Sequence, residues 1–543
     1  MLEVDYVIVG GGTAGCVLAN RLSADPQVEV LVLEAGAEAT SPWISIPAGV
    51  AKLYAHPTLN WRYWTEPEPA LGGRRLYWPR GKMLGGTSSL NGMTFVRGQE
   101  ADYDAWTSLA GATWSWHAVL PYFKAIEDSP FGASPLRGAG GPMKLGPVVA
   151  PHPLARAFLA SAIAAGVPAN DDYNGARQEG VGYTQLMMRD GVRVSAASAY
   201  LAPVRSRANL RVLTKSLVHR ITFSGRRATG AAFERAGAVQ QVHARREVLL
   251  CGGTVASPQI LLLSGIGDAA TLTALGIAVV ADRPAVGRNM QEHVRAPLAF
   301  RTRVPSFNRE ARGLRLVRQV IDYALHKRGL LAVSASQVNG FARSSPAVER
   351  PDLQLVFRPS SGVYRDGRFV IDDHQGVMAM VGLLRPQSRG HVALRDADPH
   401  AAPRIVAGHL TDAADVEPLV LGIRLMRRIF ATRPLADAVL AELRPGPEAG
   451  DDAALRAYIH ATADSLYHAV GTCAMGTDAA SVSTPDLRVR GVEGLRVVDA
   501  SVMPLVPSGN TTAAVLMIAE RAADFILGQD ATVPAPACVD LTA

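Results

Sequence analysis

The sequence has few cysteines, few aromatic residues and no long hydrophobic run. Only 6% of its 543 residues are aromatic. Its 4 cysteines show no Cys-x-x-Cys spacing, which argues against a disulfide framework and against a structural zinc site. No apolar run approaches the roughly 20 residues that a membrane-spanning helix needs. The strand-like start, MLEVDYVIVG, leaves no room for a secretory signal, so we predict a cytoplasmic location.

The sequence also lacks a cluster of charges of one sign. There are 55 Lys and Arg residues against 48 Asp and Glu residues, a formal net charge of +7, but no run of five basic residues occurs. Dispersed basic residues are typical of a solvated surface, so we predict no nucleic-acid partner. The length predicts two or more lobes and leaves the oligomeric state unknown.

Glycine, in contrast, is abundant, with 51 residues of which several gather in short stretches. The first stretch is Gly10-x-Gly12-x-x-Gly15, which directly follows a Val- and Ile-rich strand predicted over residues 5–9. A helix and a second strand are predicted to follow, and that strand ends at Glu34. This order and spacing predict a βαβ unit that binds an adenine dinucleotide.

Each residue type in that unit has a physical role in holding a dinucleotide. Glycine permits a tight turn and lets the backbone approach a pyrophosphate, while the helix start offers free N–H groups and a positive dipole end to the phosphates. Glu34 can accept two ribose hydroxyls and disfavours a 2′-phosphate, so NADP is not predicted. The fingerprint does not separate NAD from FAD.

Two further stretches of small residues lie between apolar segments. Residues 80–95, RGKMLGGTSSLNGMTF, favour a backbone that runs against a flat ligand over a plain surface loop. Residues 246–267 predict a strand, a small-residue turn and a helix that begins near Ser257 and Pro258. Residues 300–460 carry many Arg, Pro and Asp, and their alternating stretches predict antiparallel strands in a second, mixed lobe.

Taken in order, these stretches resemble the glucose–methanol–choline family of flavin-dependent oxidoreductases, which includes bacterial alcohol and choline dehydrogenases. The resemblance runs from Asp5 to about Leu527. Residues 81–104 (GKMLGGTSSLNGMTFVRGQEADYD) and 253–267 (GTVASPQILLLSGIG) are similar to the two family signatures. Further similar segments are VGRNMQEH (286–293), RPQSRGHVAL (385–394) and VVDASVMP…NTTAA (497–514).

The resemblance implies an α/β fold, with a Rossmann-like FAD-binding domain and a second α+β substrate domain built on an antiparallel sheet. The implied FAD-binding domain is discontinuous and covers residues 1–155, 205–300 and 465–530. The implied substrate-binding domain covers residues 156–204 and 301–464, and residues 531–543 form a tail.

The resemblance also implies a set of FAD-binding residues: Gly10, Gly12, Thr13, Ala14, Gly15, Glu34, Ala35, Gly86, Asn91, Met93, Val218, Asp499, Ala500, Thr511 and Thr512. Some members attach the flavin through a histidine just before the signature asparagine. Here that position is Leu90, which cannot form the bond, so we predict non-covalent FAD.

The resemblance places His468 and Asn510 at the reactive edge of the flavin. Small residues follow His468 and allow close packing beside a flat ring. A histidine there can take the hydroxyl proton of an alcohol while hydride passes to flavin N5, and Asn510 can hold the substrate oxygen. Asn510 also stands at the start of the last predicted helix and can serve as its N-cap. We expect His293 to have a structural or supporting part.

These features predict FAD-dependent oxidation of a primary aryl, furan or aliphatic alcohol to the aldehyde, with oxygen or a quinone reoxidising the flavin. Gln337 stands where choline-directed members carry a glutamate, which disfavours choline. A quinone acceptor would make the protein peripheral to a membrane. Candidate substrate-pocket residues are Trp61, Gln337, Phe357, Tyr364 and Tyr467.

Several alternatives stay open at this point. A hydroxynitrile lyase of the same fold would keep FAD in a non-redox role, and an NAD-dependent dehydrogenase would satisfy the fingerprint alone. A photochemical or non-catalytic flavin protein is disfavoured by His468. The motifs do not separate an oxidase from a dehydrogenase, and they predict no metal site.

Overall fold

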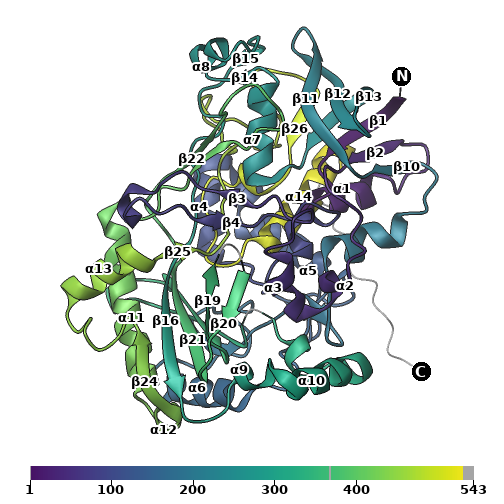
Figure 1. Cartoon of the computed structure of the whole chain (residues 1–543). Helices are drawn as coiled ribbons and strands as arrows, with labels where there is room; N and C mark the ends of the chain where they lie inside the picture. Colours follow the sequence, from purple (N-terminus) through teal and green to yellow (C-terminus); the bar gives the residue numbers. More distant parts are fainter. Residues whose placement is uncertain (1, 335, 366–367, 530–543) are drawn as a thin grey trace.

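The computed structural model describes residues 2–334, 336–365 and 368–529, and its chain forms two lobes, each built on a seven-stranded sheet. Figure 1 shows the first sheet in the upper lobe and the second in the lower lobe. This arrangement confirms the predicted α/β fold with a second lobe on an antiparallel sheet. The predicted tail, residues 531–543, lies outside the described residues.

The first sheet has the strand order β10-β2-β1-β13-β12-β11, with β26 beside β13. It is parallel from β10 to β13 and antiparallel from β13 to β11. Its central strands are buried on both faces, as expected for parallel strands covered by helices. The strands are β1 (Leu2–Val9), β2 (Val30–Leu33), β10 (Leu210–Leu213), β11 (Ser216–Ser224), β12 (Arg227–Arg235), β13 (Ala238–Leu250) and β26 (Leu495–Val497).

Helices α1 (Thr13–Leu22) and α14 (Thr512–Leu527) pack against each other beside this sheet, although they lie at opposite ends of the chain. The predicted strand over residues 5–9 lies within β1, and the predicted first helix lies within α1. Residues from the N-terminal and C-terminal segments therefore meet at the carboxyl ends of the parallel strands, where open α/β sheets bind ligands.

The second sheet is antiparallel and has the order β24-β16-β21-β18-β17-β7, with β25 beside β16. Strand β16 crosses the predicted domain limit at residue 300 and lies whole in this sheet. Helices α11 (Val416–Phe430), α6 (Pro153–Ala164) and α13 (Asp452–Thr462) belong to this lobe. The strands are β7 (Gly180–Tyr183), β16 (Val294–Thr302), β17 (Val338–Ala342), β18 (Leu353–Arg358), β21 (Gly376–Leu383), β24 (Val439–Arg444) and β25 (Asp464–Ser465).

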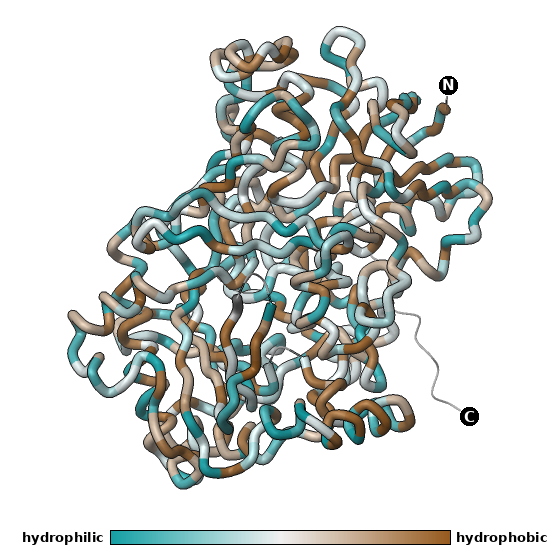
Figure 2. Tube along the Cα trace, viewed as in Figure 1, coloured by the Kyte–Doolittle hydropathy of each residue, from teal (hydrophilic) through white to brown (hydrophobic). Residues whose placement is uncertain are grey.

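Shorter elements connect and flank the two sheets, and the hydrophobic segments of the trace run through both lobes (Figure 2). The strand pairs are β3 (Tyr63–Trp64) with β4 (Tyr77–Trp78), β5 (Glu127–Asp128) with β6 (Met143–Lys144), β8 (Met188–Arg189) with β9 (Val192–Arg193), β14 (Ile266–Gly267) with β15 (Ala281–Asp282), β19 (Gly362–Arg365) with β20 (Arg368–Ile371), and β22 (His391–Ala393) with β23 (Arg404–Val406). The other helices are α2 (Pro42–Ser45), α3 (Val50–Leu53), α4 (Glu100–Ala110), α5 (Trp116–Ile126), α7 (Gly253–Leu263), α8 (Ala269–Ala274), α9 (Phe307–Glu310), α10 (Gly313–His326) and α12 (Leu435–Ala438). In the described ranges, no helix is long and apolar enough to cross a membrane.

Helix α7 begins earlier than predicted, so the predicted start near Ser257 and Pro258 is wrong. Pro258 lies inside the helix and has no N–H to donate to the carbonyl of Thr254, four residues earlier. That carbonyl instead accepts a hydrogen bond from the Thr472 hydroxyl at 2.7 Å. A side chain that is distant in sequence thus satisfies the group that the proline leaves unpaired, and the helix continues through it.

Candidate active site

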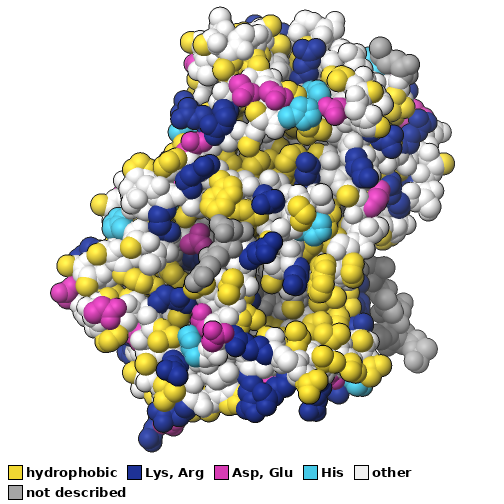
Figure 3. All heavy atoms as spheres, in the orientation of Figure 1, with side chains coloured by type: hydrophobic (Ala, Val, Ile, Leu, Met, Phe, Trp, Pro, Cys, Tyr) yellow, Lys and Arg dark blue, Asp and Glu magenta, His cyan; other side chains and the backbone are white. Residues whose placement is uncertain are grey.

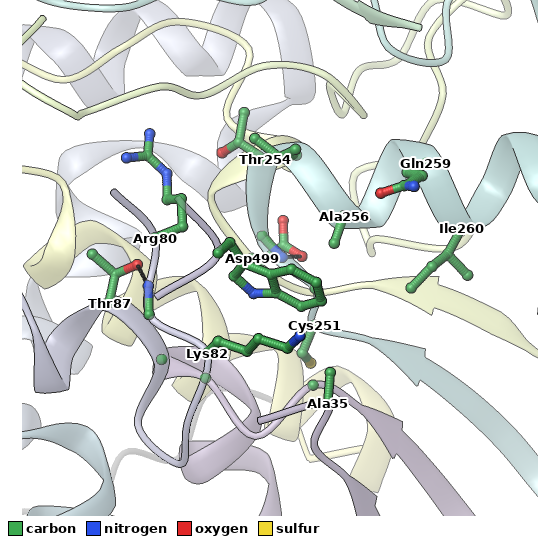
Figure 4. A pocket seen from close by; sticks show the side chains of 18 of the residues that line it. Ala35, Arg80, Lys82, Thr87, Cys251, Thr254, Ala256, Gln259, Ile260 and Asp499 are labelled. Atoms are coloured by element: carbon green, nitrogen blue, oxygen red, sulfur yellow. Dashed lines mark hydrogen bonds between the residues drawn. The ribbon is translucent and has the colours of Figure 1, made fainter. Parts of the chain in front are cut away.

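A cavity of about 430 Å³ lies where the N-terminal and C-terminal segments meet at the first sheet. In Figure 4 the Lys82 side chain extends across it, while α7 presents Thr254, Ala256 and Ile260 from another side. The predicted site residues that line it are Gly10, Gly12, Thr13, Ala14, Glu34, Ala35, Trp61, Gly86, Val218, Tyr467, Asp499, Ala500, Thr511 and Thr512. The fingerprint and the C-terminal segment therefore bound one continuous space.

The glycines of the fingerprint occupy positions that a larger residue would not fit, or that a ligand would fill. Gly10 has a φ of +106°, and a Cβ there would lie 2.5 Å from the carbonyl oxygen of Cys251. A Cβ at Gly15 would lie 2.0 Å from the carbonyl oxygen of Gly10, so the helix can approach the strand only without a side chain. At Gly12 the nearest atoms would be 3.9 Å away, which leaves an open cradle in the cavity wall.

The start of α1 offers backbone N–H donors to that cradle. Its N-cap is Gly12, and no side chain caps it. The first N–H groups of a helix have no partner within the helix, and they carry the positive end of its dipole. A pyrophosphate fits this chemistry, so the residues present suit an adenine dinucleotide.

Glu34 is fixed at the end of β2 by two backbone N–H groups. Its Oε2 accepts from Gly11 at 2.8 Å and its Oε1 accepts from Gly36 at 2.7 Å. Burial raises the pKa of Glu34 to about 7, and these two donors, together with Lys82, oppose that rise. The carboxyl group is held at the cavity wall with lone pairs left for ribose hydroxyls.

Asp499 also lines the cavity, but protein donors already surround its carboxylate. Oδ2 accepts from Gly253 N at 2.8 Å and from Ser257 Oγ at 2.6 Å, and Oδ1 accepts from the amide and hydroxyl of Ser501 at 2.8 and 2.5 Å. Its side chain therefore ties the start of α7 to the loop that carries Ala500, and burial raises its pKa.

The signature loop around Asn91 is tied to the start of α14. Asn91 Nδ2 donates to Thr512 Oγ1 at 3.1 Å, and Arg193 donates to the Asn91 carbonyl oxygen at 2.7 Å. Met93 is buried with a φ of +62°, and Leu90 is buried in a small apolar cluster. Asn91, Met93 and Gly15 thus lie behind the lining residues and shape the wall.

The segment after β25 and the segment before α14 bring His468 and Asn510 together. Asn510 Nδ2 lies 2.9 Å from His468 Nε2. Neither is among the residues that line the cavity, but their neighbours Tyr467, Ala469 and Thr511 are. The pair therefore lies directly behind this part of the cavity wall.

The histidine pair fixes a single tautomer for His468. His293 Nε2 lies 3.0 Å from the Leu384 carbonyl oxygen, which can only accept, so that nitrogen carries the proton. His293 Nδ1 must then accept from His468 Nδ1, 3.0 Å away. His468 Nε2 is left as a lone pair that faces Asn510.

Burial keeps both histidines neutral, which this chain of hydrogen bonds requires. Burial is the first cause that holds the pKa of His468 well below its ordinary value, and the positive charges of Arg80 and Arg295 add to the lowering. Burial lowers the pKa of His293 to about 4. At neutral pH His468 therefore presents a base, and not an acid, at Nε2.

The backbone of His468 is positioned by a buried carboxyl group that the sequence did not single out. Glu292 Oε1 accepts from the His468 amide N–H at 2.7 Å, and Glu292 Oε2 lies 4.0 Å from the Arg80 guanidinium. Burial raises the pKa of Glu292 to about 7 despite these partners. Glu292 and His293 both lie in the quoted VGRNMQEH segment, so the motif was a signal for them.

A second polar side chain extends the chain of contacts beyond Asn510. Gln354 Nε2 donates to Asn510 Oδ1 at 3.1 Å and to Asn339 Oδ1 at 3.0 Å. Because its oxygen accepts from Gln354, the Asn510 amide presents its N–H₂ group to His468. Gln354 and Asn339 lie on the neighbouring strands β18 and β17, and no pattern in the sequence pointed to either.

The predicted substrate residues divide into two groups. Trp61 and Tyr467 line the cavity, with the Lys82 ammonium 4.3 Å from the Trp61 ring and the Tyr54 ring 5.8 Å from the Tyr467 ring. Phe357 is fully buried and stacks on Phe158 at 4.4 Å, so its ring belongs to the apolar core.

Gln337 is likewise not among the described residues that line the cavity. Gln337 is fully buried, and its Oε1 accepts from the His152 amide N–H at 2.9 Å, which fixes it beneath the start of α6. The side chain of Tyr364 lies outside the described residues. Full burial, which the sequence did not distinguish from a pocket position, separates Phe357 and Gln337 from Trp61 and Tyr467.

Part of the cavity wall is formed by the loop after β22, which contacts the first sheet. Glu234 Oε2 lies 3.4 Å from His219 Nε2 and 3.0 Å from His400 Nε2. His400 is among the lining residues, and Gln259 Nε2 donates to the Ala401 carbonyl oxygen at 3.0 Å. These contacts hold the loop against the cavity.

Comparison with known proteins identifies the class of protein that this fold and cavity define. Two family profiles described as GMC oxidoreductase match residues 4–295 and residues 386–519. The chain belongs to the GMC oxidoreductase family. Its cofactor is FAD, and it is an oxidoreductase acting on CH–OH substrates, which passes their electrons to an acceptor.

Its relatives include enzymes with several names. It is 40% identical over 531 residues to alcohol dehydrogenase (acceptor) of Pseudomonas putida, covering 96% of this chain and 95% of that protein. It is 42% identical over 539 residues to mitochondrial choline dehydrogenase of Homo sapiens, covering 97% and 90%. The crystal structure of pyridoxine 4-oxidase from Mesorbium loti matches with a TM-score of 0.88 at 32% identity, covering 97% of this chain and 100% of that one.

Proposed function

We propose that this protein oxidises a primary alcohol with an apolar or aromatic body to the aldehyde. The observation that carries the proposal is the lone pair of His468 Nε2, which the His293 contact fixes toward Asn510. FAD supplies the hydride acceptor when bound. The residues of this chain supply the base and the donor that orient the alcohol oxygen.

The geometry supports a division of labour between the two side chains. His468 takes the hydroxyl proton at Nε2 and becomes a cation whose Nδ1–H remains bonded to His293. Asn510 donates from Nδ2, because its oxygen is held by Gln354, and so binds the alcohol oxygen without a titrating charge. The relatives named alcohol dehydrogenase and pyridoxine 4-oxidase support an alcohol of this kind.

Choline remains the less favoured substrate despite the choline dehydrogenase relative. Gln337, the position that we aligned with a choline-binding glutamate, carries no charge. The carboxyl group nearest to His468 in the described contacts, Glu292, is bonded to the His468 amide and faces Arg80. Gln337 brings no carboxylate, and that of Glu292 is buried and lies beside Arg80, so neither offers an exposed carboxylate for a quaternary ammonium.

The experiment is anaerobic mixing of the yellow protein with a panel of primary alcohols, including benzyl, furfuryl and linear alcohols, and with choline. Bleaching by the apolar alcohols at rates well above choline is the expected result. Rapid return of the colour in air identifies an oxidase, and slow return identifies a dehydrogenase that serves a quinone. Bleaching by choline alone contradicts the proposal, and no bleaching together with cyanohydrin cleavage identifies a hydroxynitrile lyase.

We also propose that the FAD is held without a covalent bond. Leu90, buried beside Tyr54, occupies the position of the linking histidine in members that attach their flavin. Acid precipitation should release all yellow colour into the supernatant. Flavin that stays with the precipitated protein contradicts this part.

A further inference from the structure

Helix α10 turns its apolar side toward solvent. Leu314 is 89% exposed, Val317 54%, Ile321 54% and Leu325 71%, and these four side chains follow the spacing of one helical stripe. Val320, next to the stripe, is 47% exposed. A surface helix normally packs such a stripe against the core, so this helix has the reverse orientation.

The orientation of α10 is fixed by polar contacts on its other side. Tyr323, the one buried residue of the helix, donates from its hydroxyl to the Gly191 carbonyl oxygen at 3.0 Å. Gln319 Oε1 accepts from the Leu330 amide at 2.8 Å, and Gln319 Nε2 donates to Glu310 at 3.3 Å. These contacts attach the polar side of α10 to the protein, so the apolar stripe on the other side faces solvent.

Basic residues flank the apolar stripe. Residues 309–328 contain six Lys and Arg residues and two acidic residues, and Asp322 is already bonded to His326 and Arg328. Arg315 and Arg318 are exposed, and no ion pair joins either of them to another described residue. Figure 3 shows the apolar patch at the lower right, over α10, with Lys and Arg side chains around it.

We propose that α10 docks on the surface of an anionic lipid bilayer. The stripe Leu314, Val317, Ile321 and Leu325 would lie among the acyl chains, while Arg315 and Arg318 would contact headgroup phosphates. Such a combination of an exposed apolar face with a basic flank is the pattern of helices that lie in the membrane interface. An anionic bilayer suits this face better than a second copy of the chain does. A second copy would bring its own excess of positive charge to the same contact, and the two would repel each other.

The docking face is connected to the reaction end of the cavity. The segment after α10 reaches Ser334, whose hydroxyl is hydrogen-bonded to the Gly92 carbonyl oxygen beside Asn91. Tyr323 contacts Gly191, two residues before Arg193, which donates to the Asn91 carbonyl. If the proposed function holds, a membrane-dissolved alcohol or quinone would meet the protein on this side; the docking itself does not rest on that function.

The test is sedimentation of the holoenzyme with sucrose-loaded vesicles of phosphatidylcholine containing phosphatidylglycerol, and with vesicles of phosphatidylcholine alone. We expect binding to the anionic vesicles that weakens as salt is added. The double variant Leu314→Glu/Leu325→Glu should bind at least about tenfold more weakly, since two charges replace two buried apolar side chains. Arg315→Gln/Arg318→Gln should lose affinity for anionic vesicles selectively.

The matched control is Val239→Glu/Leu440→Glu, which changes two exposed apolar residues outside α10, 64% and 50% exposed, and should bind as the unchanged protein does. Equal FAD content and equal reduction by a soluble alcohol in all variants separate a docking defect from a failure of folding or of the proposed function. Absence of vesicle binding by the unchanged protein, or undiminished binding by Leu314→Glu/Leu325→Glu, overturns the proposal. A dimer that dissociates in that variant, without vesicle binding, assigns the face to a second copy instead.

Discussion

At the dinucleotide end of the cavity, the contacting groups are close in the chain: the Glu34 carboxyl group binds an amide that is 23 residues away. At the reaction end, His468 contacts a histidine that is 175 residues away, and Asn510 contacts a glutamine 156 residues away. The first end is a local βαβ unit, whereas the second end is assembled by the docking of two sheets. The two ends therefore should fail in different ways when they are altered.

The reaction end is expected to show the largest effect. His468→Ala should lower the rate of flavin reduction by an alcohol about 10²–10⁴-fold, because the base at Nε2 is removed. FAD content should stay the same, since the dinucleotide end is untouched. Stopped-flow anaerobic reduction measures the rate, and His409→Ala, another buried histidine that packs against Trp78 instead, is the control. An unchanged rate in His468→Ala would remove the proposed mechanism.

The dinucleotide end should show the complementary behaviour. Glu34→Gln should raise the dissociation constant for FAD about 10–100-fold, because charge-assisted hydrogen bonds to the ribose are lost. With saturating FAD, the reduction rate should equal that of the unchanged protein. Fluorescence titration of the apoprotein with FAD measures the affinity. A reduction rate that falls as far as the affinity would show that the two ends are not separable.

Substitutions of His293 test whether the positioning of His468 contributes to the rate of flavin reduction. His293→Leu should lower the reduction rate about tenfold, since His468 Nδ1–H loses its acceptor and the tautomer is no longer fixed. His293→Gln, which restores an acceptor, should recover part of the rate. If the substitutions act only by disturbing the packing, the reduction rate should fall equally in both variants. That result would show that His293 has only a structural role.

The pH dependence of the same reaction sharpens the assignment. A base that must be neutral loses activity as pH falls through its folded pKa, and the pKa of His468 is held well below its ordinary 6.5. The acid limb of the reduction rate should therefore lie below pH 6.5. A limb at or above pH 6.5 in the unchanged protein contradicts the assignment of His468 as the buried base.

The smallest expected effect is on the stability of the fold, through the hydrogen bond between the Thr472 hydroxyl and the Thr254 carbonyl oxygen. Thr472→Val should lower the free energy of unfolding by about 1–3 kcal/mol, because the Thr254 carbonyl that Pro258 leaves unpaired loses its donor. Urea unfolding of the FAD-loaded protein measures it. Thr107→Val, which removes a half-buried helix hydroxyl bonded to Tyr103 at 3.3 Å, should change the free energy by less.

The sequence pointed to residues that gather around one cavity where the chemistry is local or carried by a motif. The glycine spacing, Glu34 and the segments around His468 and Asn510 all line or adjoin the cavity. It did not separate Phe357 and Gln337 from residues that line the cavity, because a buried aromatic ring or amide looks the same in the sequence whether it faces a core or a pocket. It also missed Gln354 and Asn339, whose contact depends on the register of β17 with β18.

The sequence by itself determined the βαβ unit, the dinucleotide cradle and the family, because turn glycines and strand–helix periodicity act over a few tens of residues. It also contained the apolar and basic residues of α10, but not the direction in which they point. Only the tertiary structure decided the tautomer of His468, the partner of Asn510 and the outward face of α10. Each of these depends on which distant segment supplies the neighbouring atom, and close packing of the two sheets alone decides that.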